Sequence, residues 1–494
     1  MRWRLLSSLL VILVTRSTCD YFDELCYSQD SDYSSLSDFD PHDDGQEGSP
    51  GNSDEDSVLF DGTVSLVTGR FDVLNPDVGP RGELFFEGDM VVDDDYSEEG
   101  GLPEGLERQF LPMNEFLWPE DPKTGLPNVP FTISGSANRT RKLIIDAIAM
   151  WEKETCITFT ELKNPKEENY VAFTGSVGCW SYVGRQYKKP GGQSLSVGSG
   201  CYKPGIIAHE VGHALGMLHE QSRSDRDDYV VIVWDNIQPQ KFKNFKKRDS
   251  ENGNVPYDTS SIMHYGGSFF SKVGKPTLMT KNPLHQWHLG QRDRLTFRDV
   301  QVVNNLYGCT ERWALGCKNK TMECKNEGYL DKSCVCRCPP GTSGDRCQHV
   351  IGDYYPELQC GGNITEACNI STPNFPKPFS SDTWCLWWIQ ASLCQQVKLT
   401  FHTFNLMYRS EGSCYFDTME IRDDDPIMPG KEYCGCEITK GQEFKSRNGS
   451  IFLSFHGKYQ QQRGFNATVE FIDDAACMEK FMTGVQHLVS ADER

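Results

Sequence analysis

Several features that whole classes of protein depend on are missing from this chain of 494 residues. After the apolar run Leu5 to Val14, which two serines interrupt, no stretch is apolar enough to cross a bilayer, so we expect no membrane span. Basic residues number 49 against 70 acidic ones, a balance that argues against a nucleic-acid partner. The serine-hydrolase motif G-x-S-x-G is also absent, and this absence leaves no activated serine as a candidate nucleophile.

The acidic charge is concentrated in one segment. Residues 20–108 contain 26 Asp and Glu against three Arg, whereas residues 109–494 are nearly neutral, at about −1. The segment is rich in Ser, Asp and Gly and cannot bury a core, so we predict that it is largely disordered. Composition alone allows either an acidic interaction tail or a pro-segment.

The first residues indicate secretion. A basic start, the short apolar run and small polar residues up to Cys19 are typical of a signal peptide over residues 1–19. Twenty cysteines fit an oxidising, extracellular compartment. The six N-x-S/T sequences are candidate glycosylation sites, at Asn138, Asn319, Asn363, Asn369, Asn448 and Asn466. A chain of this length should fold as three or more units.

A metal motif begins at His209 and reads H-E-V-G-H-A-L-G-M-L-H. On a helix, His209 and His213 lie on one face, and Glu210 can reach a water on the same cation as general base. Gly216 permits the left-handed conformation that reverses the chain and brings in His219. Three histidines with one open position are typical of catalytic zinc. A buried helix with incidental histidines is the alternative.

The residues after the motif carry a family resemblance. His219 is followed by E-Q-S-R-S-D-R-D-D-Y, and S-I-M-H-Y spans 261–265. Together with G-C-W-S-Y-V-G from Gly178, these strings resemble the astacin family of the metzincin clan. The resemblance implies a two-lobed α+β protease domain with one zinc at the floor of a cleft. It also implies that Met263 lies beneath the zinc and that Tyr265 is a mobile ligand that stabilises the oxyanion.

The acidic segment contains a second family motif. Residues 86–90 read F-E-G-D-M and resemble the F-x-G-D motif by which astacin propeptides block the active site. The resemblance implies that Asp89 binds the zinc in the zymogen, in place of the catalytic water. We therefore expect a propeptide over residues 20–108, cut after Arg108 by a trypsin-like protease, and a catalytic domain over residues 109–309.

Two further residues receive roles from the resemblance. The new amino terminus at Gln109 is expected to turn inward towards Glu220, which could otherwise be a solvated acid at a helix end. Arg292 belongs to a segment that in similar enzymes lines the pocket just after the scissile bond. There it would favour Asp or Glu, and the alternative is an ordinary surface arginine.

Local patterns place these residues on elements. Leu143 to Glu154 has helical spacing of apolar residues, residues 155–161 alternate as a strand, and the zinc helix should begin near Lys203. We expect residues 179–185 to be an edge strand that offers its main chain to an extended substrate. The family pattern implies the disulfides Cys156–Cys309 and Cys179–Cys201.

Residues 313–348 contain six cysteines and resemble an EGF-like module. The spacing alone permits fifteen pairings. The resemblance selects Cys317–Cys334, Cys324–Cys336 and Cys338–Cys347. A zinc ribbon is the alternative, and no acidic calcium signature precedes the first cysteine.

Residues 360–472 resemble a CUB β-sandwich, followed by a tail over residues 473–494. The resemblance implies Cys360–Cys385 and Cys414–Cys434, and among the four extra cysteines one possible pairing is 368–394 with 436–477. Asp417 matches a CUB calcium ligand, but the upstream glutamate is missing, so calcium binding is doubtful. Such modules bind protein partners or serve as spacers.

The sequence thus predicts a secreted zinc endopeptidase, made as a zymogen, that acts on extracellular or matrix proteins. The alternative from another class is a catalytically silent adhesion or matrix-binding protein that uses its two C-terminal modules. The intact set of site residues argues against it: His209, Glu210, His213, His219 and Tyr265.

Overall fold

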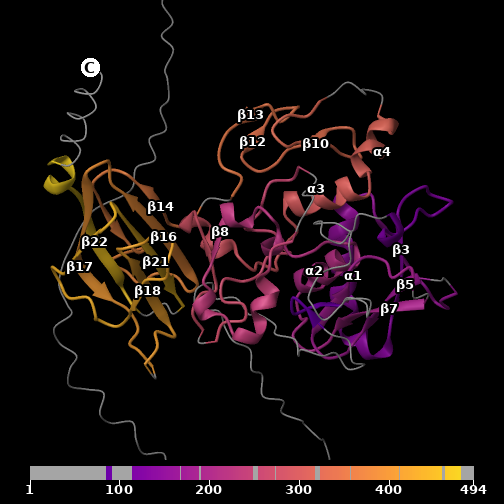
Figure 1. Ribbon diagram of the computed structural model, residues 1–494, viewed down its shortest axis with the longest axis horizontal. Coiled ribbons are helices and arrows are strands. Elements are labelled where there is room, and N and C mark those ends of the chain that lie inside the picture. Colours follow the sequence, from indigo (N-terminus) through magenta and orange to yellow (C-terminus); the bar gives the residue numbers. More distant parts are fainter. Residues whose placement is uncertain are drawn as a thin grey trace, which may run out of the picture. The chain divides into compact units, whose positions relative to one another are not determined.

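The structure is a computed structural model, and it describes ten ranges of the chain (Figure 1). These ranges are 85–91, 114–166, 169–188, 191–248, 254–272, 274–317, 323–355, 358–410, 412–458 and 462–479. They form two compact units, one of the described residues up to 355 and one of most of residues 358–479. Within these ranges every helix is too short or too polar to cross a lipid bilayer.

The first unit contains a seven-stranded sheet. Its order is β1-β2-β6-β7-β5-β3-β4, and only the β1–β2 and β6–β7 pairs are antiparallel. The strands are β1 Phe85–Phe86, β2 Met90–Val91, β3 Asn128–Ile133, β4 Thr158–Glu161, β5 Asn169–Thr174, β6 Cys179–Tyr182 and β7 Gly191–Val197.

Two helices pack together beside this sheet. α1 spans Arg141–Glu154, two residues longer at its start than predicted, and α2 spans Pro204–Ala214, where the zinc helix was predicted. Proline suits the first turn of α2 because its missing N–H would have no helical partner there. The Trp151 indole N–H donates to the Ala208 carbonyl at 3.0 Å and joins the two helices inside the core.

The second lobe has little regular structure. Its strands are β8 Val230–Ile232 and β9 Leu278–Thr280, and a buried cluster that includes Phe245, Tyr257, Tyr265, Phe269 and Phe270 forms its core. The short 3₁₀ helices of the unit are η1 Asn114–Phe116, η2 Gly135–Thr140, η3 Glu220–Ser222, η4 Arg226–Asp228, η5 Trp234–Asn236, η6 Pro239–Phe245 and η7 Pro283–His288.

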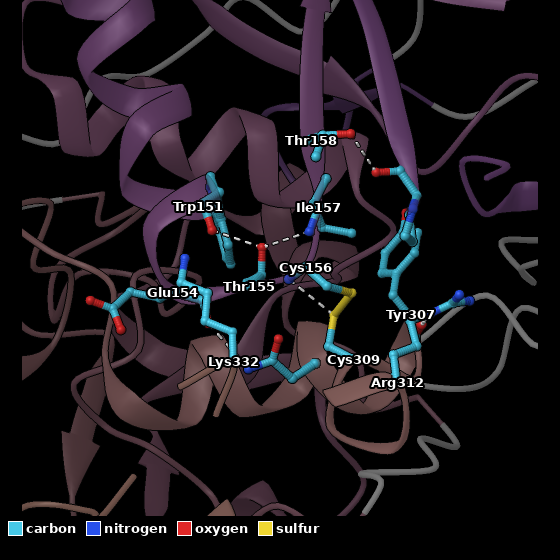
Figure 2. Close-up of a disulfide and its surroundings, with 12 residues drawn as sticks. Trp151, Glu154, Thr155, Cys156, Ile157, Thr158, Tyr307, Cys309, Arg312 and Lys332 are labelled. Carbon is cyan, nitrogen blue, oxygen red and sulfur yellow. Dashed lines mark hydrogen bonds between the residues drawn. A yellow bond between two sulfur atoms is a disulfide. The ribbon is translucent and has the colours of Figure 1, made fainter. Parts of the chain in front are cut away.

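The catalytic part ends with two helices, α3 Phe297–Leu306 and α4 Cys309–Gly316. α3 begins with a capping box, in which Thr296 and Asp299 each bond the other's backbone N–H. The disulfide Cys156–Cys309 joins the segment after α1 to the start of α4 (Figure 2). Both disulfides that the resemblance implied for this domain, this one and Cys179–Cys201, are present.

A small module follows α4 in the same unit. It contains two two-stranded sheets and the three implied disulfides, Cys317–Cys334, Cys324–Cys336 and Cys338–Cys347. Its strands are β10 Tyr329–Leu330, β11 Cys336–Arg337, β12 Thr342–Ser343 and β13 His349–Val350. It contacts the catalytic part directly, because Arg337 pairs with Glu154 at 2.7 Å and Lys332 Nζ donates to the Lys153 carbonyl at 2.8 Å.

The second unit is a sandwich of a five-stranded and a four-stranded sheet, with orders β14-β16-β21-β18-β19 and β15-β22-β17-β20. Aromatic and aliphatic side chains fill the space between the sheets. The strands are β14 Gly361–Ile364, β15 Cys368–Ser371, β16 Thr383–Gln390, β17 Gln395–Asn405, β18 Asp417–Arg422, β19 Lys431–Tyr433, β20 Glu443–Lys445, β21 Ser450–Gly457 and β22 Gly464–Asp473.

One cysteine pairing in this unit differs from the prediction. Cys360–Cys385 and Cys414–Cys434 are present, but Cys394 bonds to Cys477, so the pairing 368–394 with 436–477 is wrong. The reason is the sheet register. Gln395 at the start of β17 pairs with Asp473 at the end of β22, which brings the chain after β22 back to Cys394.

Asp417, the candidate calcium ligand, lies at the start of β18. It is fully buried, and its carboxylate accepts hydrogen bonds from the backbone N–H groups of Met407 and Lys458 at 3.1 and 3.0 Å. Each of its two oxygens therefore already accepts one backbone hydrogen bond.

Some predictions concern residues outside the described ranges. They are the signal peptide 1–19, the propeptide apart from residues 85–91, the Arg108–Gln109 bond, Asn319 and residues 480–494. Of the other candidate glycosylation sites, Asn138, Asn363, Asn369 and Asn448 are exposed and Asn466 is half-buried.

Candidate active site

Two backbone carbonyls orient the histidines of α2. The Nδ1–H of His209 donates to the Ile262 carbonyl at 2.7 Å, and that of His213 donates to the Met217 carbonyl at 2.8 Å. A carbonyl can only accept, so both rings carry their proton on Nδ1 and turn Nε2 towards the site. Such partners fix the tautomer and ring orientation of metal-binding histidines.

The chain reverses after α2, as the sequence predicted. Gly216 has a φ of 105°, a left-handed conformation that residues with a Cβ rarely adopt. Two carbonyls at the end of α2 accept hydrogen bonds from side chains outside the helix. The Trp118 indole N–H donates to the Ala214 carbonyl at 2.8 Å, and the Tyr307 hydroxyl donates to the carbonyl of Leu215, the residue after the helix, at 3.0 Å. The reversal brings His219 to the face that carries the other two histidines.

Four ligand atoms converge on one point. One ligand atom each of Asp89, His209, His213 and His219 lies within 4.8 Å of all the others, and all four residues are buried. Asp89 Oδ2 lies 3.1 Å from His209 Nε2, and its Oδ1 lies 3.1 Å from His219 Nε2 and 3.6 Å from His213 Nε2.

The site residues fit a zinc ion. Although His219 Nε2 and Asp89 Oδ1 lie 3.1 Å apart, they form no hydrogen bond, and among the described residues neither buried atom has another partner, which is costly unless a cation satisfies them. Three imidazoles and one carboxylate oxygen are a donor set that tetrahedral zinc accepts.

Glu210 lies beside this point. It is 2% exposed, and its Oε2 has no hydrogen-bond partner within the described ranges. Burial, reinforced by the nearby carboxylate of Asp89, raises the pKa of Glu210 well above its ordinary value. A carboxylate with an unoccupied oxygen is poised to accept a proton.

Met263 packs beneath α2. It is fully buried, and its carbonyl accepts a hydrogen bond from the Glu220 backbone N–H at 3.1 Å. Gly212 allows this close approach, because a Cβ at that position would lie 2.8 Å from Met263 Sδ. Met263 therefore packs against the middle of α2, and its position beneath the zinc stays a prediction.

Residues 85–91, which belong to the predicted propeptide and are called the pro-segment below, lie along an edge of the sheet and reach the site. β2 pairs in parallel with β6, Met90 opposite Ser181, and the Ser181 N–H donates to the Asp89 carbonyl at 2.9 Å. Without β1 and β2, β6 would be the edge strand, as predicted, although it ends at Tyr182 rather than Arg185. The pro-segment thus covers the strand edge predicted to bind substrate.

Two functional residues were missed by the sequence analysis. Glu87 is fully buried and its carboxylate lies 2.9 Å from both His219 Nδ1 and Arg248 Nε. The guanidinium of Arg248 also lies 4.0 Å from the centre of the Phe86 ring, a cation–π contact. The acidic residue between Phe86 and Gly88 was the only signal in the sequence, and nothing marked Arg248.

Tyr265 is fully buried next to His219, with 4.7 Å between the ring centres. Its hydroxyl donates a short hydrogen bond to the backbone carbonyl of Glu87. The proposed oxyanion donor therefore already binds a peptide carbonyl of the pro-segment.

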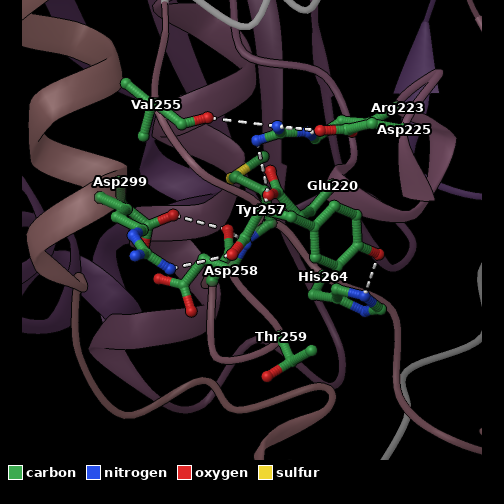
Figure 3. Close-up of polar contacts among 12 residues, drawn as sticks. Glu220, Arg223, Asp225, Val255, Tyr257, Asp258, Thr259, His264 and Asp299 are labelled. Atoms are coloured by element: carbon green, nitrogen blue, oxygen red, sulfur yellow. Dashed lines mark hydrogen bonds and ion pairs between the residues drawn. The ribbon is translucent and has the colours of Figure 1, made fainter. Parts of the chain in front are cut away.

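Glu220 belongs to a buried polar network (Figure 3). Its Oε1 accepts from Arg223 Nη1 at 3.0 Å and from the Asp258 backbone N–H at 2.8 Å. Burial raises the pKa of Glu220 to about 7, although the Arg223 guanidinium opposes the shift. A solvated acid at a helix end is therefore the wrong interpretation. Residues 109–113 lie outside the described ranges, so the contact with Gln109 stays a prediction.

Arg292 is half-buried rather than freely solvated. Its Nη1 donates to the carbonyls of His264 and Gln291 at 3.1 and 2.9 Å. Its charge lowers the pKa of Glu210, which burial raises, so the guanidinium acts on the catalytic region. Its predicted specificity role stays a prediction.

Comparison with known proteins identifies the family. The model of the astacin peptidase family matches residues 118–308, and the CUB domain model matches residues 360–469. The chain is 33% identical over 426 residues to "Zinc metalloproteinase dpy-31" of Caenorhabditis elegans, covering 82% of this chain and 69% of that protein. The chain belongs to the astacin family. This astacin-family chain therefore carries one zinc ion, for which the site offers three histidines.

Two further comparisons show how much of the chain is similar to known proteins. "Blastula protease 10" of Paracentrotus lividus is 34% identical over 397 residues, which are 78% of this chain and 65% of that protein, just under two thirds. Among solved structures, high choriolytic enzyme 1, a hatching enzyme zinc-protease from the medaka Oryzias latipes, is 39% identical. That match covers 39% of this chain and 94% of the enzyme, with a TM-score of 0.36.

Proposed function

We propose that this astacin-family chain is a secreted zinc-dependent endopeptidase, made as a zymogen, that hydrolyses extracellular or matrix proteins. The observation that carries the proposal is the convergence of three histidine Nε2 atoms beside Glu210, beneath a pro-segment carboxylate. The alternative of a silent adhesion protein is disfavoured, because every residue that the reaction needs is present and buried in one place.

Each site residue has its own role in the proposed reaction. His209, His213 and His219 hold the zinc, which when bound polarises the scissile carbonyl and lowers the pKa of water. Glu210 takes a proton from the attacking water and passes it to the leaving amine. Tyr265 donates its hydroxyl to the oxygen that becomes negative in the transition state, as it now donates to the Glu87 carbonyl.

The same geometry supports the proposal of a latent zymogen. Asp89 fills the position that the attacking water needs, and β2 covers the strand edge that an extended substrate would use. Cleavage after Arg108 by a trypsin-like protease would release residues 20–108. The new amino group at Gln109 would then turn towards Glu220.

The remaining parts of the chain extend this function. We assign residues 109–309 to the catalytic domain, residues 313–348 to an EGF-like module and residues 360–472 to the CUB domain, which the family model matches over residues 360–469. These modules would bind protein partners, and exposed asparagines such as Asn138 would carry glycans outside the cell.

The test compares the activated full chain with its Glu210→Gln variant. The variant should keep one zinc, because its histidines are unchanged, and lose nearly all peptide hydrolysis, at least about a thousandfold, because the base is gone. Metal analysis and cleavage of a quenched peptide library measure both quantities. 1,10-Phenanthroline should abolish cleavage by the wild type. Substantial turnover by a zinc-loaded Glu210→Gln variant would exclude the mechanism.

A further inference from the structure

Two buried side chains hold the backbone of Tyr265, one on each side of its Cα atom. The Tyr265 N–H donates to Gln221 Oε1 at 3.2 Å, and the Tyr265 carbonyl accepts from the Nδ1–H of His264 at 2.9 Å. A carbonyl can only accept, so His264 carries its proton on Nδ1. Because Gln221 and His264 are fully buried, both contacts are shielded from water.

Each of the two side chains is connected to a further part of the site. The Tyr257 hydroxyl donates to the unprotonated Nε2 of His264 at 2.7 Å and so fixes the imidazole from its other side (Figure 3). Gln221 belongs to η3 and follows the zinc histidine His219 by two residues. The backbone of Tyr265 is therefore bonded to the segment that carries a zinc ligand.

A fixed backbone leaves rotation of the side chain as the way for the Tyr265 hydroxyl to move. Its ring lies nearly parallel to that of Phe269, with 4.6 Å between the ring centres, and contacts Phe245 and Phe270 with 5.7 Å between the centres. The hydroxyl donates to the Glu87 carbonyl, the kind of contact that the proposed mechanism assigns to it with the scissile carbonyl. Such donors stabilise a transition state most when they are held in place before the reaction.

The amide of Gln221 is only half satisfied. Its Oε1 accepts from Tyr265, but its Nε2 has no hydrogen-bond partner within the described ranges. A buried N–H without an acceptor lowers stability, so stability alone does not explain a glutamine at this position. A methionine of similar shape would remove the contact with Tyr265 together with the unsatisfied donor.

We propose that Gln221 and His264 are positioning residues, which hold the backbone of Tyr265 so that its hydroxyl reaches the scissile carbonyl oxygen in the transition state. The proposal rests on the proposed peptidase function and on the role of Tyr265 in it. Neither residue touches zinc or substrate in this role, and both act through Tyr265. A purely structural role would instead lower stability and leave the turnover of the folded enzyme unchanged.

The test is a double-mutant cycle in the activated full chain. Tyr265→Phe should lower kcat by about a hundredfold, the size expected for loss of one transition-state donor. Gln221→Met should lower kcat by about tenfold with little change in KM, because a displaced hydroxyl loses part of that contribution. In the Tyr265→Phe background the same Gln221→Met change should leave kcat within about twofold, because no hydroxyl remains to be positioned.

A glutamine elsewhere in the second lobe provides the matched control. Gln286 is also buried, its Oε1 accepts from the Thr280 N–H at 2.8 Å, and its Nε2 donates to the Leu278 carbonyl at 2.9 Å. Gln286→Met should therefore lower the melting temperature and keep the wild-type kcat. Gln221→Met should show the opposite pattern, a lower kcat with a nearly unchanged melting temperature.

His264 gives a second test that does not depend on the folding of Gln221→Met. His264→Leu should lower kcat as Gln221→Met does, and only when the Tyr265 hydroxyl is present. His264→Asn, which keeps an N–H near the position of Nδ1, should retain most of the wild-type kcat. Equal losses with and without that hydroxyl, or a wild-type kcat in the folded, zinc-loaded variants, would overturn the proposal. A zinc-loaded wild type that cleaves no peptide would instead overturn the proposed function.

Discussion

At the scale of single residues, Glu87 and Asp89 of the proposed pro-segment occupy three positions at the candidate site. Asp89 lies among the zinc histidines, the Glu87 carbonyl accepts from Tyr265, and the Glu87 side chain pairs with Arg248. Gly88 makes this possible, because it has a φ of 90° and a Cβ there would lie 2.7 Å from the Phe270 ring. The proposed latency would therefore be shared between two carboxylates rather than carried by one.

This sharing predicts a graded response in the uncleaved precursor. With Arg108→Gln to prevent maturation, Asp89→Ala should raise peptide hydrolysis by at least about tenfold, because it removes the charged group from the position of the water. Glu87→Gln should give a smaller rise, since Asp89 remains in place. Initial rates on one quenched peptide measure both. An Asp89→Ala precursor that folds, binds zinc and stays as silent as its parent would place latency elsewhere.

The sequence predicted the zinc histidines because their arrangement is local. The spacing of His209 and His213 follows from helix geometry, and one glycine accounts for the return of His219. The ion pair of Glu87 and Arg248 follows no such rule, because 161 residues separate its members. No spacing pattern predicts a contact that only the folded chain creates.

At the scale of elements, α2 is held by close approaches at two glycines. A Cβ on Gly205 would lie 1.9 Å from the Arg292 carbonyl oxygen, which belongs to the backbone. A Cβ on Gly212 would lie 2.8 Å from Met263 Sδ, near the end of a flexible side chain. The zinc helix is thus packed more rigidly at its start than at its centre.

Two alanine substitutions in α2 test this difference. Gly205→Ala should cost at least about 2 kcal/mol, because a backbone oxygen cannot rotate away. Gly212→Ala should stay within about 1 kcal/mol, because the gain in helix propensity offsets the displacement of methionine. Thermal melts of the zinc-loaded chain give both values. Equal melting temperatures for the two variants would contradict the assigned contacts.

The sequence predicted helices and strands correctly where apolar residues recur at a regular spacing. α1 was predicted within two residues of its start, and β4 formed inside the predicted strand 155–161. The second lobe consists mainly of short 3₁₀ helices around an aromatic cluster. Such short elements produce no repeated spacing of apolar residues from which a helix or strand could be predicted. The Cys394–Cys477 bond depends on the pairing of β17 with β22, a register that cysteine spacing does not encode.

At the scale of the whole first unit, the small module and the chain that follows it are built onto the catalytic part. Arg298 of α3 pairs with Glu327 at 3.1 Å and stacks on the Tyr354 ring at 3.9 Å. The Tyr354 hydroxyl donates to Asp258 Oδ2 at 2.9 Å. The Asp258 backbone N–H in turn bonds Glu220, the neighbour of the third zinc histidine. A chain of bonded groups therefore runs from the module to the metal site.

Removal of one hydroxyl from this chain of contacts should destabilise the catalytic part. Tyr354→Phe leaves the ring on Arg298 but leaves Asp258 Oδ2 without its donor, and Asp258 is only 1% exposed. A hydrogen bond to a charged group contributes about 1.5–3 kcal/mol. For a unit of this size the melting temperature should therefore fall by roughly 5 °C. The measurement is loss of peptidase activity of the activated full chain after brief heating.

The control is the same substitution at an exposed position. Tyr202 is 58% exposed, so Tyr202→Phe should leave the melting temperature unchanged. If Tyr354→Phe behaved like Tyr202→Phe, the residues after the module would form a passive linker. A selective loss in Tyr354→Phe would instead mean that the catalytic domain includes contacts well beyond Cys309. The segment that follows the module would then be part of the structure that holds Asp258 and Glu220 in place.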